Sequence, residues 1–292
     1  MARPSCEDDS VLGSESLKGL RGALVINLAI CAIEFAGGFW TGSLALISDA
    51  SHNAVDCAAL TAGIVANFLS RRPPDERRTF GYRRVEVLAA LANGVGLWIV
   101  AAILLRAAYF SFEHPKPVRA VAMLWLAGMG LVGNAVSSLL VFSAGKTNIN
   151  ARAIFLHLAS DVLSSAAAIA AGLIILKTGW PYADAAATVL ICLIIVGASL
   201  WLIKDAVHIL LEGAPSHLDL GEVRAALESI DGVREVHDLH LWSLTSGAES
   251  MSGHLIVDRG LDQEMVLESG RRMLKEKFGL THVTLQIESE KN

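Results

Sequence analysis

The sequence has little charge for its length and few cysteines. Only 18% of its 292 residues are charged, whereas 53% are hydrophobic, and the mean hydropathy is +0.49. Soluble domains average about 25% charged residues, so this composition excludes a protein that is soluble throughout. The four cysteines include no CxxC pair, which argues against a disulfide framework and a cysteine zinc site. The net charge of −5 provides no broad basic surface, so we expect no nucleic-acid partner.

Three sequence patterns are also missing. Residues 1–19 are acidic and contain no apolar core, so we expect a cytoplasmic tail with a free thiol at Cys6 and no cleavable signal peptide. No HExxH motif supplies the zinc ligands and general base of a metalloprotease. No GxxxxGK[ST] motif is present to bind ATP phosphates. We therefore expect no enzymatic activity and no cofactor.

Long apolar runs dominate the first two thirds of the chain. About 20 apolar residues cross a bilayer as a helix, and six runs are long enough. These runs cover residues 21–41, 44–69, 86–112, 119–143, 153–176 and 183–206. Because the loops between them are short, neighbouring helices should pack antiparallel. We therefore predict a membrane all-α domain, a six-helix bundle, over residues 20–212.

Basic residues in the loops predict the orientation of this bundle. Short loops rich in Lys and Arg stay in the cytoplasm. The amino end, the second loop and the fourth loop hold eleven basic residues, whereas the alternate loops hold only Lys116, Arg119 and Lys177. Both termini are therefore predicted to be cytoplasmic.

Residues 213–292 have a mixed polar composition and form a second predicted domain. Apolar residues recur with the helical period over 219–230 and 262–277. Short β-type runs cover 233–244, 251–257 and 281–288. The order αββαβ predicts a cytoplasmic α+β domain of ferredoxin-like type. In its first strand, regular alternation would place His237 on the same face as Leu239 and Leu241.

Ionisable residues inside membrane spans are costly and are candidates for function. His52 and Asp56 in the second span, like His157 and Asp161 in the fifth, are four residues apart and share a helix face. Together they offer two nitrogens and two oxygens, a tetrahedral set that suits zinc. The alternative is that these four side chains only hydrogen-bond one another and so hold the helices together. Four costly groups are more than helix association needs. Asp49 either orients the His52 imidazole or caps a helix turn.

These residues carry a resemblance to the cation diffusion facilitator family of proton-coupled metal exporters. The similar segments are SLALISDASHNAVD, TFGYRRVEVLAAL, FLHLASDVLSS, LLEGAP and VHDLHLWSLTSG. The resemblance implies a homodimer with six spans and a transport site on His52, Asp56, His157 and Asp161. It also implies zinc as the substrate, often with cadmium or cobalt. The histidine-rich insertion of eukaryotic relatives is missing from the fourth loop, which favours a bacterial inner (plasma) membrane.

The resemblance also assigns residues outside the membrane. It implies a cytoplasmic site for a regulatory zinc ion on His237, His254 and Glu288. The alternative is a set of sheet histidines that hydrogen-bond at the dimer surface. It further implies a charge pair between Arg84, where the third span begins, and Glu212, after the sixth. We expect this pair to link the membrane bundle to the soluble domain across the dimer.

The expected function is export of a divalent transition metal from the cytoplasm in exchange for protons. Zinc and protons compete for imidazole and carboxylate groups, so exchange follows once the site faces each side of the membrane in turn. Two other classes could use the same residues, a membrane metal-dependent hydrolase and a metal sensor. A catalytic zinc needs an open position and a general base, for which the sequence offers no candidate. A sensor acting through its soluble domain would leave the membrane ligands unexplained.

Overall fold

The chain forms two compact units. The computed structural model describes the backbone of residues 14–144, 151–245 and 247–289, and the side chains of these residues other than 14–23, 138, 140–144 and 151–159. One unit comprises Met1–Ala62 and Ala92–Leu202, and the other comprises Gly63–Leu91 and Ile203–Asn292. The first unit is helical, and the second combines the ends of three long helices with a small sheet.

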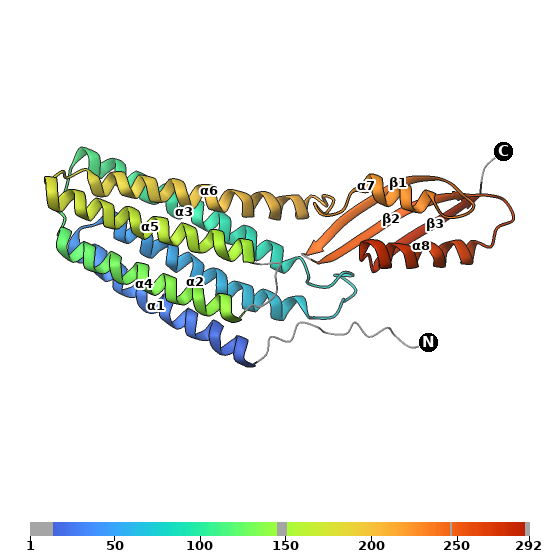
Figure 1. Cartoon of the computed structure of the whole chain (residues 1–292), viewed down its shortest axis with the longest axis horizontal. Coiled ribbons are helices and arrows are strands. Elements are labelled where there is room, and N and C mark those ends of the chain that lie inside the picture. Colours follow the sequence, from blue (N-terminus) through green and yellow to red (C-terminus); the bar gives the residue numbers. More distant parts are fainter. Residues whose placement is uncertain (1–13, 145–150, 246, 290–292) are drawn as a thin grey trace. The chain divides into compact units, whose positions relative to one another are not determined.

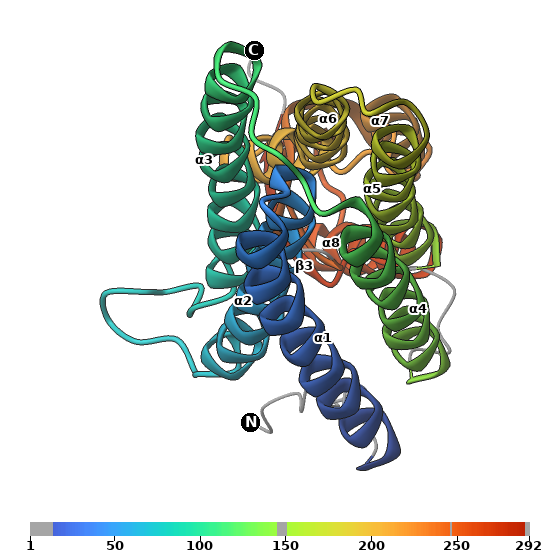
Figure 2. The ribbon, with the colours of Figure 1, turned by 90° about the vertical axis from the view of Figure 1, so that its left-hand side faces the viewer.

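Six long helices make up the membrane domain (Figure 1). They are α1 (Ser14–Thr41), α2 (Leu44–Ser70), α3 (Val85–Glu113), α4 (Ala120–Ala144), α5 (Ala151–Thr178) and α6 (Ala183–Leu210). Each contains an apolar window long enough to cross a bilayer. Seen along the helices, α1 lies between α2 and α4, and α6 lies between α3 and α5 (Figure 2). The predicted six-span bundle is confirmed.

Small residues let the helices of the first unit approach closely. Ala127 of α4, Ala168 of α5 and Ala187 of α6 belong to one buried cluster. Gly130 of α4 lies so close to Glu34 of α1 that a Cβ at this position would overlap the Glu34 carboxyl group. Lipid provides no hydrophobic drive for helix association, so close packing of this kind holds the bundle together.

Asp184, near the start of α6, caps the start of α2. Its buried carboxylate accepts hydrogen bonds from Ser43 Oγ at 2.5 Å, from the Leu44 amide at 2.6 Å and from the Ala45 amide at 3.3 Å. The first amides of a helix have no partner within the helix, and its positive end favours a carboxylate. Asp184 therefore anchors to α6 the helix that carries His52.

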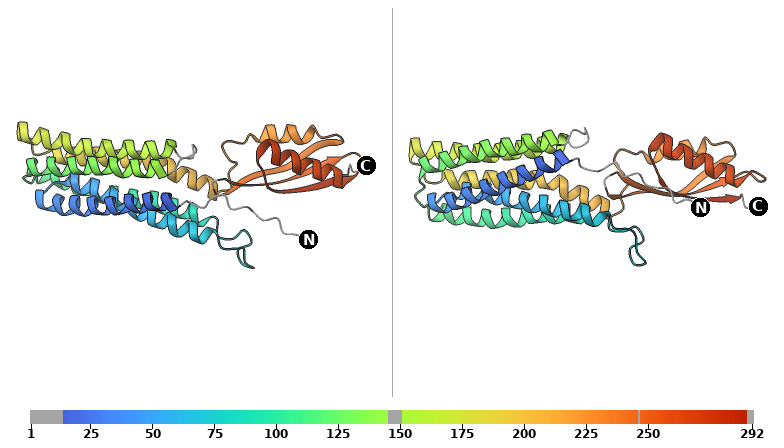
Figure 3. Two further views of the ribbon diagram at one scale, coloured as in Figure 1. Left: turned by 60° about the horizontal axis from the view of Figure 1, so that its bottom comes forward. Right: turned by 90° about the horizontal axis from the view of Figure 1, so that it is seen from below.

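The second unit contains the predicted α+β domain. Its elements are α7 (Leu220–Glu228), β1 (Val233–Thr245), β2 (Ala248–Val257), α8 (Gln263–Phe278) and β3 (His282–Ser289). The strand order is β1-β2-β3; β1 and β2 are antiparallel, whereas β2 and β3 are parallel. Both helices cover the same face of the sheet (Figure 3) and share a buried core with it. The predicted order αββαβ is confirmed.

Strand β1 contains an irregularity that changes which residues face the core. The pairing register with β2 shifts just after His237, and Asp238 has a φ of 50°. Val236 and Leu239 are buried, whereas His237 is only partly buried. The expectation that His237 shares a face with Leu239 is therefore wrong, because an extra residue in one strand shifts the alternation by one position.

Candidate metal centres

Three of the four predicted transport ligands converge inside the membrane domain. His52 and Asp56 lie one turn apart on α2, and Asp161 lies on α5. His52 Nε2 is 3.1 Å from Asp161 Oδ1 and 3.4 Å from Asp56 Oδ2. One ligand atom from each residue lies within 4.8 Å of the others. A single cation placed among these atoms could therefore contact all three side chains.

The fourth predicted ligand, His157, lies on α5 four residues before Asp161. Its side chain is outside the part of the chain whose side chains the structure describes. The helical spacing places the two residues on one face. Its participation stays a prediction.

Asp49 forms a hydrogen bond between the two ligand-bearing helices. Ser165 Oγ of α5 donates to Asp49 Oδ2 at 2.9 Å, and both residues are fully buried. Asp49 lies about one turn before His52, and Ser165 lies one turn after Asp161. Ser165 was not expected from the sequence, although its position four residues after Asp161 places it on the same face of α5. The predicted orientation of His52 by Asp49 stays a prediction.

A second buried carboxylate lies beside this cluster. Asn53, the residue after His52, donates to Glu34 Oε2 of α1 at 3.1 Å, and Glu34 is 1% exposed. Through Asn53, the polar interior extends from α2 to α1. The Glu34 carboxyl group fits against α4 because residue 130 is a glycine, which has no side chain in that space.

The cytoplasmic candidates also converge, one from each strand of the sheet. His237 of β1 is paired with His254 of β2, and Glu288 lies on β3. Glu288 Oε2 lies 3.3 Å from His237 Nε2, and Glu288 Oε1 lies 3.1 Å from His254 Nδ1. Asp238, displaced by the irregularity in β1, lies 3.7 Å from His254 Nε2. Asp238 was not expected at this cluster, because regular alternation would turn its side chain away from that of His237.

The charge environment of this cytoplasmic cluster favours ionised carboxylates. Partial burial opposes ionisation of Glu288, but hydrogen bonds from Gln286 and His237 and the nearby imidazoles hold its pKa below the usual range. The hydrogen bond from His240, together with the nearby imidazoles, lowers the pKa of Asp238. Both carboxylates are therefore ionised and able to bind a cation at neutral pH.

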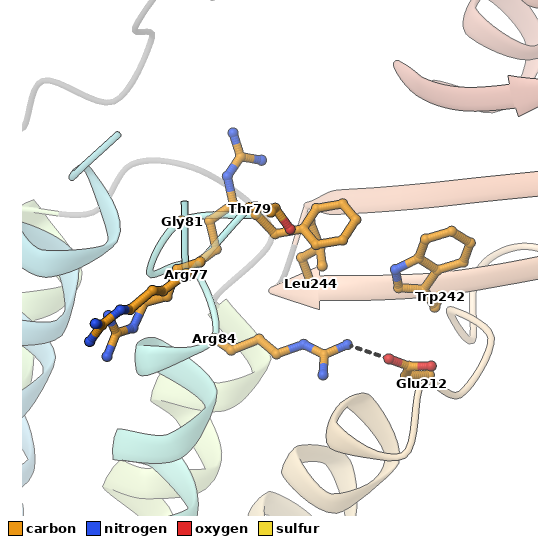
Figure 4. A pocket seen from close by; sticks show the side chains of 10 residues that line it. Arg77, Thr79, Gly81, Arg84, Glu212, Trp242 and Leu244 are labelled. Atoms are coloured by element: carbon orange, nitrogen blue, oxygen red, sulfur yellow. Dashed lines mark hydrogen bonds and ion pairs between the residues drawn. The ribbon is translucent and has the colours of Figure 1, made fainter. Parts of the chain in front are cut away.

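Arg84 and Glu212, the residues of the predicted charge pair, contact each other within one chain, in the second unit. A link across a dimer stays a prediction. Arg84 donates to Glu212 Oε1 at 3.1 Å (Figure 4). Glu212 has a φ of 60°, and its side chain is 64% exposed. Next to this pair, Glu86 of α3 accepts hydrogen bonds from Ser70 of α2 and from Thr245 of β1. These contacts join the ends of α2 and α3 to the sheet.

A cavity of about 280 Å³ opens beside the Arg84–Glu212 pair, between the loop that joins α2 to α3 and strand β1. Four arginines of that loop line it, together with Trp242 and Leu244 of β1. Within the loop, Asp75 accepts hydrogen bonds from the backbone amides of Arg77 and Arg78, which hold its pKa below the usual range.

Known proteins resemble the chain over nearly its whole length. The family models described as "Cation efflux transmembrane domain" and "Cation efflux protein, cytoplasmic domain" match residues 20–211 and 215–290. The "Cation efflux system protein CzcD" of Alcaligenes sp. is 39% identical over 93% of this chain and 86% of its own. The "Cadmium, cobalt and zinc/H(+)-K(+) antiporter" of Bacillus subtilis is 37% identical over 88% of this chain and 84% of its own.

Two further proteins are similar to the chain in sequence. The "Zinc transporter ZitB" of Escherichia coli is 37% identical over 91% of this chain and 85% of its own. The solved metal-bound C-terminal domain of the CzcD transporter from Cupriavidus metallidurans is 44% identical, covering 24% of this chain and 99% of that chain, with a TM-score of 0.24.

Proposed function

The chain belongs to the cation efflux family, and from this membership we propose that it exports a divalent transition metal, zinc above all, from the cytoplasm in exchange for protons. It is an integral membrane cation efflux transporter and not an enzyme. The observation that supports the proposal most strongly is the convergence of His52, Asp56 and Asp161 within 4.8 Å inside two membrane spans.

We assign the transported metal to a tetrahedral site formed by these three residues and His157. Two imidazole nitrogens and two carboxylate oxygens suit zinc better than harder cations such as manganese. The printed names of relatives include zinc, cadmium and cobalt, in agreement with this donor set. Cadmium and cobalt are accordingly expected as secondary substrates.

Protons provide the opposing flux in this proposal. A zinc ion requires a neutral imidazole and ionised carboxylates, so metal binding releases protons and proton binding releases metal. The same side chains can then carry metal in one direction and protons in the other. The only chemical requirement is that the site opens to each side of the membrane in turn.

The cytoplasmic cluster is proposed as a regulatory zinc site in a homodimer. His237, His254 and Glu288 lie at the surface of a sheet, outside the spans. The matching cytoplasmic family model and the bacterial relatives support a dimer in a bacterial inner membrane. The basic loops support an orientation with both termini in the cytoplasm.

Metal-driven proton flux in reconstituted vesicles tests this function. Inside-out vesicles with a trapped pH indicator would receive zinc, cadmium, cobalt or manganese in turn. We expect zinc to enter and protons to leave through the parental protein but not through Asp56→Ala. The matched control is Ser164→Ala, because Ser164 is a buried polar residue of α5 outside the ligand cluster.

Two outcomes would count against the proposal. If no metal entered vesicles containing the parental protein, the transport function would be wrong. If zinc entered without a matching movement of protons, the exchange mechanism would be wrong.

A further inference from the structure

We propose that the loop between α2 and α3 binds the phosphate of an anionic phospholipid from the cytoplasmic leaflet. This loop, residues 71–84, is called the arginine loop because it contains six arginines and only two acidic residues. Export of metal requires no such site. The proposal relies on the proposed orientation of the protein only for the choice of leaflet.

The charge of the cavity beside the arginine loop favours an anion. Its lining contains four arginines and one acidic residue, Glu212, so the net charge of the lining is +3. Arg84 is neutralised by Glu212 at 3.1 Å. Arg78 lies over the Tyr82 ring, 4.7 Å from its centroid, and also contacts Asp75. These contacts involve two of the four arginines in the lining.

Arg77 and Arg83 have no ion-pair partner among the residues that the structure describes. Figure 4 shows Arg84 turned toward Glu212, whereas Arg77 points away from that pair. A guanidinium group can form two parallel hydrogen bonds with phosphate oxygens. Arg77 and Arg83 are therefore the residues assigned to the phosphate.

The surroundings of the arginine loop favour a lipid over a free anion. The loop leaves α2 after Ser70 and enters α3 at Val85, and both helices are long enough to cross a bilayer. In this proposal the loop therefore adjoins the headgroup layer. Apolar side chains next to it are exposed: Phe68 at the end of α2 by 70%, and Leu88 at the start of α3 by 52%. Phosphate-binding and acyl-chain-binding groups are thus adjacent, as a phospholipid requires.

The simpler explanation is that the arginines only set the orientation of the helices. Orientation requires positive charge but no cavity and no preference for one headgroup. The two explanations therefore differ in whether the folded protein selects anionic lipid.

Lipid retention by the full-length protein in neutral detergent separates them. The protein would be incubated with equal amounts of phosphatidylcholine and phosphatidylglycerol, and retained lipid would be measured by native mass spectrometry. We expect a clear preference for phosphatidylglycerol. Each basic residue near the surface contributes about fivefold to anionic-lipid affinity, so the double variant Arg77→Gln/Arg83→Gln should lose about 25-fold. The control Arg271→Gln/Arg272→Gln removes the same charge from exposed positions of α8 and should keep the preference.

Three results would overturn the proposal. The first is equal retention of the two lipids by the parental protein, which needs no variant and so cannot be blamed on misfolding. The second is an unchanged preference in the folded double variant, with its dimer state checked by size exclusion. The third is stabilisation against heating by inorganic phosphate as large as that by phosphatidylglycerol, which would assign the cavity to a free anion. Zinc transport by the parental protein in phosphatidylcholine vesicles, measured separately, shows whether the proposed function stands apart from this site.

Discussion

The two candidate metal clusters use the same kinds of ligand on different supports. In the membrane cluster, His52 and Asp56 belong to α2 and Asp161 belongs to α5. No backbone hydrogen bond joins these two helices among the residues that the structure describes. In the cytoplasmic cluster, His237, His254 and Glu288 come from three strands whose backbones are hydrogen-bonded to each other. The membrane ligands are 5%, 12% and 6% exposed, whereas the cytoplasmic ligands are 29–37% exposed.

This difference suggests different uses for the bound metal. Packed helices can shift against each other by small sliding movements, so a site divided between α2 and α5 can open and release its ion. A site spread over a sheet can change shape only if backbone hydrogen bonds break. We therefore expect the membrane cluster to handle a passing ion and the cytoplasmic cluster to hold a resident one.

If helix packing shapes the membrane cluster, removing a remote anchor of α2 should impair transport. Asp184→Asn replaces the buried carboxylate that caps α2 with an amide that accepts fewer hydrogen bonds. We expect at least a tenfold loss of zinc uptake and a loss of about 2–3 kcal/mol in stability. Ser199→Ala is the control, because Ser199 of α6 bonds to Trp98 of α3 and not to α2. If Asp184→Asn took up zinc at the parental rate, anchoring of α2 by Asp184 would not be needed for transport.

A change of ligand type should separate the two clusters by selectivity. His52→Asp keeps a donor at the transport site but replaces nitrogen with oxygen, which favours harder cations such as manganese. Uptake should show a lower zinc-to-manganese ratio and an optimum at lower pH, since aspartate titrates below histidine in water. His254→Asp should leave the transport ratio unchanged. The same shift in both variants would contradict separate roles.

The junction between α3 and the end of α6 should show a smaller effect. Arg84→Glu and Glu212→Arg each place like charges together and should slow transport a few-fold, and the double exchange should recover part of the rate. The effect is limited because exposed ion pairs contribute about 1 kcal/mol or less. Uptake rates of the four proteins, compared at low and high salt, measure it. If both single charge reversals left the uptake rate unchanged, the Arg84–Glu212 pair would have no role in transport.

The smallest predicted effect concerns acid stability of the sheet. The pKa values of Asp238 and Glu288 lie below their usual range, so their stabilising contribution is present above the usual pKa of about 4 and is lost as the pH falls through the lowered values. Protection of the β1–β3 amides against hydrogen exchange, measured relative to the intrinsic exchange rate at each pH, should fall over this range in the intact protein. Glu288→Gln should flatten the response, and an unchanged profile would show that these carboxylates do not stabilise the sheet.

The sequence was sufficient for the arrangement of elements and for part of the membrane cluster. Hydrophobic run length predicted the six spans, and local periodicity predicted the order αββαβ, because both signals lie within one element. The convergence of His52, Asp56 and Asp161 followed from two i,i+4 pairs in apolar helices. That last inference required only that costly polar groups in a membrane find one another.

Contacts between distant segments were not predictable in the same way. Asp184 caps a helix that begins 140 residues earlier, and no local pattern connects the two positions. The position of His237 was misjudged because the extra residue at Asp238 depends on how β1 pairs with β2. The bond between Ser165 and Asp49 likewise depends on the contact of α5 with α2.

The most direct test is to measure zinc moved and zinc retained in the same vesicles for Asp161→Ala and Glu288→Gln. Radioactive zinc would be supplied under an imposed pH gradient, with protein amount and dimer state matched. We predict that Asp161→Ala moves no zinc but still retains the ion of the cytoplasmic cluster, whereas Glu288→Gln retains less zinc but continues to move it. Transport at the parental rate by Asp161→Ala would contradict the assignment of the membrane cluster as the path of the metal.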